Sequence, residues 1–155
     1  MSFAAAPGQG CSMSIKQATP YLSFNGTAEA AIELYTRALG AEAQAGVMRY
    51  ADMPAETGTC APEDRQRIMH ACLRLGEASL MLSDVPSEQP AMTHGNMSVC
   101  LEFDDVEEMA RKFDALAAGG AVLMNVHDAF WGAKFGMLSD KFGIVWMFIG
   151  HGPSK

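Results

Sequence analysis

An internal duplication constrains this chain more than any other feature of its sequence. A strand-like stretch, a helical stretch and a terminal glycine in residues 22–40 recur in residues 101–119, at an offset of 79. Such a repeat predicts a pseudo-symmetric architecture built from two copies of one unit. The matched pairs are Leu22 with Leu101, Phe24 with Phe103, Glu29 with Glu108, Ala31 with Ala110, Leu34 with Phe113, Ala38 with Ala117, and Gly40 with Gly119.

The helical stretch of the first copy has clear boundaries. We expect Thr27 to be its N-cap and Gly40 to end it, because these residue types are favoured at the two ends of a helix. The apolar residues between them fall at helical spacing, which predicts one buried face. They are Ala28, Ala31, Ile32, Tyr35 and Leu39.

A second correspondence closes each copy. Residues 73–82 predict a strand, a tight turn at Gly76 and another strand, and residues 140–149 repeat the turn at Gly143, at an offset of 67. Each copy is therefore expected to be a βαβββ unit.

The domain organisation follows from these two units. We expect a disordered leader over residues 1–14, a first unit over 15–85, a linker over 86–95 and a second unit over 96–150, with 15–150 forming one structural domain. Proline and serine mark the linker, since proline interrupts strands.

Composition excludes several classes of function. The chain has 155 residues and a net charge of −7, and its eleven basic residues are scattered, so neither nucleic acid nor an anionic membrane surface is expected as a partner. No apolar run reaches the roughly 18 residues of a membrane span. The four cysteines form no CxxC pair, which favours buried free thiols and a cytoplasmic location.

Several separated motifs then resemble one known family. The chain is similar to the PhnB-like group of the vicinal-oxygen-chelate (glyoxalase/bleomycin-resistance) superfamily from about residue 18 to residue 149. The resemblance rests on PYLSFNG at 20–26 followed by AEAAIELY, HACLRLG at 70–76, LMLSD at 80–84, FWGAKFG at 130–136 and SDKFGIVW at 139–146.

The resemblance implies an α+β fold. Two βαβββ modules would form a cupped mixed sheet with the helices on its outer face, in a chain that forms a homodimer. A ferredoxin-like α+β sandwich is the alternative architecture, since it uses similar elements without the duplication. In enzymes of this superfamily the cup holds a divalent metal, bound by His or Glu on the first and last strand of each module.

The duplication locates those metal positions twice. Leu22 and Phe24 are expected to face the helices, so alternation along the strand turns Tyr21 and Ser23 toward the cup, and Cys100 and Glu102 likewise. The first-strand ligand positions then fall at Thr19 and Ser98, or at Pro20 if the register differs. The last-strand positions fall at Ser79 and Trp146. These residue types do not form a divalent-metal site, so we expect no metal and no cofactor.

Histidine and aromatic residues suggest a different use of the cup. Alternation points His70 and Cys72 into it, and aromatic residues with a few polar groups are typical of small-ligand sites. The expected ligand-binding residues are Tyr21, His70, Ser79, Ser98, Glu102, Trp131, Trp146 and Phe148. Residues 50–67 are polar and aperiodic and predict a mobile loop near the cavity mouth, as a lid would be. For the methionines, core filling is expected ahead of an adaptable pocket or interface.

Two functions follow from these patterns. The first is a homodimeric, metal-independent protein that binds a small apolar or aromatic ligand in the cup. The alternative is a metal-dependent lyase, isomerase, dioxygenase or thiol transferase, with a non-standard site around His70 that Glu102 and one loop residue would complete. No pattern in the sequence names a substrate.

Overall fold

The computed structural model describes residues 17–89 and 96–152. Its elements fall into two groups of the same order. The first group consists of β1 (Tyr21–Phe24), α1 (Ala28–Leu39), β2 (Glu42–Arg49), three short 3-10 helices, η1 (Tyr50–Asp52), η2 (Ala55–Thr57) and η3 (Pro62–Asp64), then β3 (Ile68–Leu75) and β4 (Ala78–Asp84). The second group consists of β5 (Val99–Phe103), α2 (Val106–Ala117), β6 (Ala121–Asp128), β7 (Lys134–Ser139) and β8 (Val145–Gly150). The predicted leader 1–14 and residues 90–95 of the predicted linker lie outside the described residues.

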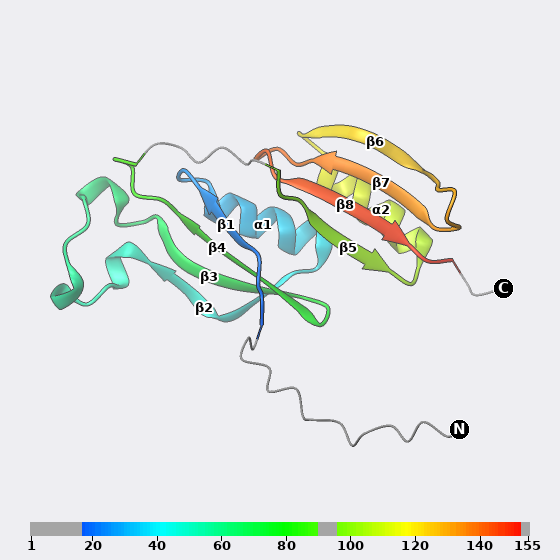
Figure 1. The fold of residues 1–155 in the computed structure, drawn as a ribbon. Coiled ribbons are helices and arrows are strands. Elements are labelled where there is room, and N and C mark those ends of the chain that lie inside the picture. Colours follow the sequence, from blue (N-terminus) through cyan, green and yellow to red (C-terminus); the bar gives the residue numbers. More distant parts are fainter. Residues whose placement is uncertain (1–16, 90–95, 153–155) are drawn as a thin grey trace, which may run out of the picture.

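The strands form two four-stranded mixed sheets with identical connectivity. Their orders are β1-β4-β3-β2 and β5-β8-β7-β6. The first and last strand of each group are parallel, and the other pairs are antiparallel. The two sheets lie next to each other and both helices cover the same side of them (Figure 1). This arrangement confirms the predicted α+β fold of two βαβββ modules and not the ferredoxin-like alternative.

Helix α1 begins and ends where the sequence predicts, but its first turn is capped from elsewhere. Gly40 adopts a left-handed φ of 73° at the C-cap, as expected. Thr27 occupies the N-cap position without a side-chain cap bond. Instead, the buried Asp84 at the end of β4 accepts hydrogen bonds from the backbone N–H groups of Ala28 (3.0 Å) and Ile68 (2.9 Å). One carboxylate therefore ties the start of α1 to β3 and β4.

The core lies between the sheets and the helices and runs through both modules. Helices α1 and α2 contact each other. Tyr35 of α1 donates a hydrogen bond to the buried Asp140 of the second module, at 2.7 Å, and packs edge-on against Trp146. The modules therefore share one hydrophobic core instead of folding around two.

The last strands of the two modules align differently from the sequence prediction. Leu22 lies beside Leu82 in the first sheet, and Leu101 lies beside Phe148 in the second, so the strands β4 and β8 correspond at an offset of 66 and not 67. The cause is the connection that precedes each strand. A two-residue turn at Gly76 and Glu77 joins β3 to β4, whereas the five residues 140–144 join β7 to β8. Gly76 and Gly143 are thus not equivalent, and a one-residue slip reverses every side chain of the strand.

The capping arrangement predicts a large loss of stability for one substitution and almost none for another. Replacing Asp84 by alanine leaves two buried N–H groups without acceptors, so the free energy of unfolding should fall by about 2–3 kcal/mol. Replacing the exposed Thr27 by alanine should change it by less than about 0.5 kcal/mol. Urea unfolding followed by circular dichroism measures both values. A larger loss for T27A than for D84A would show that the N-cap residue itself holds the helix.

Candidate functional site

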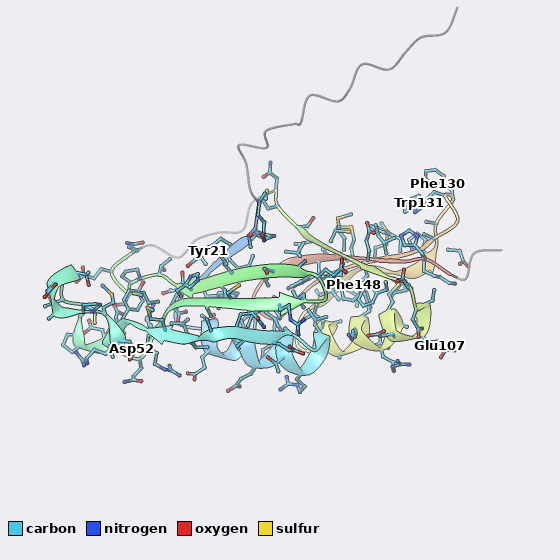
Figure 2. The ribbon with its side chains drawn as sticks, turned by 90° about the horizontal axis from the view of Figure 1, so that it is seen from below. Tyr21, Asp52, Glu107, Phe130, Trp131 and Phe148 are labelled. Atoms are coloured by element: carbon cyan, nitrogen blue, oxygen red, sulfur yellow. The ribbon has the colours of Figure 1, made fainter. Side chains whose placement is uncertain are left out.

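The face of both sheets that points away from the helices is the candidate functional surface, and we call it the open face. Strand alternation identifies its residues, because Leu80 and Leu82 of β4 and Trp146 and Phe148 of β8 are buried under the helices. Figure 2 shows Tyr21, Phe130 and Trp131 on this face, on the opposite side of the sheets from the helices. Its strongly exposed side chains include apolar ones, which is a feature of binding surfaces.

A hollow of about 330 Å³ lies on the open face over the outer strands of the first sheet. It exists because β2 bulges away from β3: the register shifts between Gln44 and Met48, and Ala45 and Gly46 have φ values of 57° and 80°. Val47 and Met48 form the apolar wall of the hollow. The residues that line the hollow are Gln44, Ala45, Gly46, Val47, Met48, Asp52, His70 and Cys72.

Two predicted site residues meet at this hollow. Tyr21 reaches from β1 across β4, and its hydroxyl lies 3.1 Å from Nδ1 of His70 on β3. The two ring centroids are 5.8 Å apart. With Nδ1 engaged by Tyr21, Nε2 of His70 is the ring nitrogen available to a ligand. The pair provides a small hydrogen-bonding group in apolar surroundings.

The open face of the second sheet carries an aromatic cluster. Phe130 and Trp131 lie in the turn between β6 and β7, where Phe130 is 98% and Trp131 53% exposed. Trp131 covers Phe135 of β7 at a centroid distance of 5.7 Å, and His127 of β6 packs edge-on against the same ring at 6.2 Å. Trp131 thus lies on the open face, as predicted, and presents one side of its indole to solvent.

The predicted orientation of Trp146 and Phe148 is wrong. Both side chains are fully buried: Trp146 contacts Tyr35 of α1, and Phe148 packs between Phe103 and Phe113. The physical reason is the one-residue slip of β8, since an offset of 67 would have turned these rings outward. The open face carries Met147 where the sequence prediction placed an aromatic wall.

The three remaining predicted residues lie on the open face, away from the hollow. Ser79 of β4 is half-buried beside Arg74. Ser98 precedes β5, and its hydroxyl lies 3.2 Å from the sulfur of Met147. Glu102 of β5 is exposed, 3.9 Å from a ring nitrogen of His151.

The predicted first-strand ligand positions, Thr19 and Ser98, precede β1 and β5, and the corrected register changes the last-strand positions alone. At the corrected register, the open-face residues of the first and last strands are Tyr21 beside Met81 and Cys100 beside Met147. His70 and Glu102 belong to different sheets. Within residues 17–89 and 96–152, no three His, Cys, Asp or Glu side chains gather in a metal-binding arrangement.

The segment between β2 and β3 is more structured than the aperiodic sequence predicts. Its 3-10 helices are anchored at both ends, since Tyr50 donates to the carbonyl of Asp84 and Arg67 donates to that of Val85. Asp52 from this segment lines the hollow, and its carboxylate accepts from the backbone N–H of Arg49. Whether the segment moves as a lid stays a prediction.

Two expectations about sulfur-bearing residues need correction. Cys60, Cys72 and Cys100 are free thiols, but none of the three is fully buried: Cys60 and Cys72 are half-buried, and Cys100 is exposed on β5. Met81, Met137 and Met147 alternate with buried residues on the open-face side of their strands, so they do not fill the core. The alternation of these methionines with the apolar residues Leu80, Leu138 and Trp146 could have shown that they point away from the core. The incorrect offset of 67 hid this, because it turned Trp146 outward.

Comparison with known proteins agrees with this architecture. The chain belongs to the Glyoxalase/Bleomycin resistance protein/Dioxygenase superfamily, whose pattern it matches over residues 18–148. It is 36% identical over 136 residues to Protein YjdN of Escherichia coli, covering 83% of this chain and 91% of that protein.

Two solved structures place the fold. Protein PA1353 from Pseudomonas aeruginosa shares 36% identity, with a TM-score of 0.79 over 88% of this chain and 98% of that one. A putative 3-demethylubiquinone-9 3-methyltransferase, PhnB protein, from Bacillus cereus shares 27% identity, with a TM-score of 0.70 over 87% and 99% of the two chains. No helix within the described part of the chain is long and apolar enough to cross a membrane.

The negative charge of Glu102 should control how fast the Cys100 thiol is alkylated. Partial burial, and then the negative charge of Glu102, raise the pKa of the Cys100 thiol. Replacing Glu102 by glutamine removes that charge, so the pKa should fall and alkylation by iodoacetamide at pH 8 should become faster, because the thiolate is the nucleophile. Mass spectrometry of the Cys100 peptide measures the rate. The exposed Glu33 of α1 offers a matched control, since E33Q should leave the rate unchanged; equal rates in E102Q and the unmodified chain would refute the electrostatic coupling.

Proposed function

We propose that this protein binds a small apolar or aromatic ligand on the open face of its sheets without using a metal ion. The observation that carries the proposal is the hollow beside the Tyr21–His70 hydrogen bond. An apolar recess with a few converging polar groups is the usual composition of a small-molecule site. The apolar wall from Val47 and Met48 would bind the body of the ligand, and His70 would orient one polar atom of it.

The charge around the hollow narrows the ligand class. Arg74, the nearest cationic side chain on β3, is paired with Glu42. Asp52 is the one acidic residue that lines the hollow, and no lysine or arginine lines it. A neutral or cationic ligand therefore fits better than an anionic one, since an anion would face Asp52 without a partner.

Metal independence is part of the proposal because of what lies on the open face of the first and last strands. The residues there are Tyr21, Met81, Cys100 and Met147. Cys100 is the one strong ligand for a divalent ion among these four, since a phenol and two thioethers bind hard or borderline divalent ions poorly. The metal-dependent alternative would need a site assembled around His70 from residues that lie in different sheets.

Three further expectations belong to the same proposal. The 27% identity to the PhnB protein of Bacillus cereus supports a place in the PhnB-like group. Exposed apolar side chains such as Leu123 of β6 support a homodimer. The free thiols Cys60, Cys72 and Cys100 support a reducing, cytoplasmic location.

A neutral fluorescent probe tests the proposed site. N-phenyl-1-naphthylamine should bind and gain fluorescence on entering the apolar hollow. Replacing Met48 by aspartate places a charge in the apolar wall and should weaken binding at least roughly tenfold. The fluorescence titration measures the dissociation constant, and elemental analysis of the same protein measures divalent metal.

The control is Met97, a methionine that is 78% exposed and lies outside the hollow. M97D should bind the probe like the unmodified chain. Equal weakening in M48D and M97D would place the binding elsewhere. A stoichiometric divalent ion in the purified protein would overturn metal independence and favour the alternative.

A further inference from the structure

A row of sulfur atoms crosses the open face of the second sheet. Four residues, one from each strand, are direct neighbours in register: Cys100 of β5 beside Met147 of β8, Met147 beside Met137 of β7, and Met137 beside Met124 of β6. We call these four residues the sulfur row. Three thioethers and one thiol on successive strands form a set of soft donors that the proposed ligand site does not use.

Strand alternation fixes the direction of the central side chains. Trp146 and Phe148 on either side of Met147 are buried under the helices. Next to Met137, Leu138 is buried, and a Cβ at Gly136 would lie 2.9 Å from the Phe113 ring of α2. Met137 and Met147 therefore project from the opposite side of the sheet.

The ends of the row share that side. The Ser98 hydroxyl 3.2 Å from the Met147 sulfur places the Ser98–Cys100 side of β5 on the same face. Met124 is directly opposite Met137 and is 43% exposed. A solvent-borne ion would therefore reach the row directly.

The spacing suits convergence on a single ion. Paired residues on neighbouring strands are about 4.8 Å apart, and a metal–sulfur bond is about 2.3 Å long. An ion above Met137 thus requires Met124 and Met147 to lean inward by about half a strand spacing. Methionine has three rotatable side-chain bonds and adapts readily to such a demand.

We propose that Met124, Met137 and Met147 form a binding site for a soft monovalent cation, Cu(I) or Ag(I), with Cys100 as a fourth sulfur at the end of the row. Thioether and thiolate ligands select such ions over Mg²⁺, Ca²⁺ and Mn²⁺, which prefer oxygen. Glu102, on the same side of β5 as Cys100, adds negative charge near the site. The site lies on the second sheet and is independent of the hollow on the first.

Silver(I) titration followed by NMR of the methionine methyl groups tests the proposal. Ag(I) is stable in air, so the folded, full-length chain is used without a reductant. The methyl signals of Met124, Met137 and Met147 should shift together and saturate at the same ratio of Ag(I) to protein. The signal of the exposed Met97 should stay in place, which separates a built site from nonspecific thioether binding.

Leucine at position 137 removes the central sulfur and keeps an apolar side chain of similar size. M137L should weaken Ag(I) binding at the other two methionines at least roughly tenfold, while M97L should leave it unchanged. Both variants keep the same free thiols, so binding of Ag(I) to these thiols affects M137L and M97L equally. Unshifted row methyls, or equal affinity in M137L and M97L, would overturn the site, and neither result depends on binding of the naphthylamine probe.

Discussion

The buried carboxylate of Asp140 determines how the second sheet meets the rest of the molecule. One of its oxygens accepts from the backbone N–H groups of Phe142 (2.9 Å) and Ile144 (3.0 Å), which shapes the connection between β7 and β8. The other accepts from the Tyr35 hydroxyl (2.7 Å) and the Trp146 indole N–H (2.9 Å). A carboxylate is costly to bury unless its oxygens are satisfied, and four donors meet that condition here. Burial and the nearby carboxylate hold the pKa of Tyr35 well above its ordinary value, so its hydroxyl remains a donor.

The same interaction decides what the open face is made of. Because the indole of Trp146 is held toward α1, alternation turns Met147 to the opposite side of β8. The face thus receives thioethers in a row across the second sheet, and its aromatic groups are Phe135 of β7 and, in the preceding turn, Phe130 and Trp131. The first sheet differs, since the bulge in β2 opens a hollow beside Tyr21 and His70. Two copies of one module therefore present two chemically different surfaces.

The fold could be predicted from the sequence because the duplication, the helix periodicity and Gly40 each depend on residues that are close together in the chain. It also placed Tyr21, His70, Ser79, Ser98, Glu102 and Trp131 on the face opposite the helices. It failed for Trp146 and Phe148, because strand orientation has a period of two and depends on loop length. The glycine at 143 resembles the turn glycine at 76, yet it belongs to a five-residue connection held by Asp140. Asp84 shows a related limit, since a cap supplied across 56 residues leaves no local signal.

The central claim is that ligands bind on the open face and not in the core around Trp146. The chain has three tyrosines. Tyr21 bonds His70 at the hollow of the open face, and Tyr35 is buried in the core against Trp146, so 3-fluorotyrosine labelling gives one fluorine reporter at each place. In a titration with N-phenyl-1-naphthylamine followed by fluorine NMR, the Tyr21 resonance should shift while that of Tyr35 stays in place. A shift of the Tyr35 resonance with Tyr21 unchanged would contradict the account.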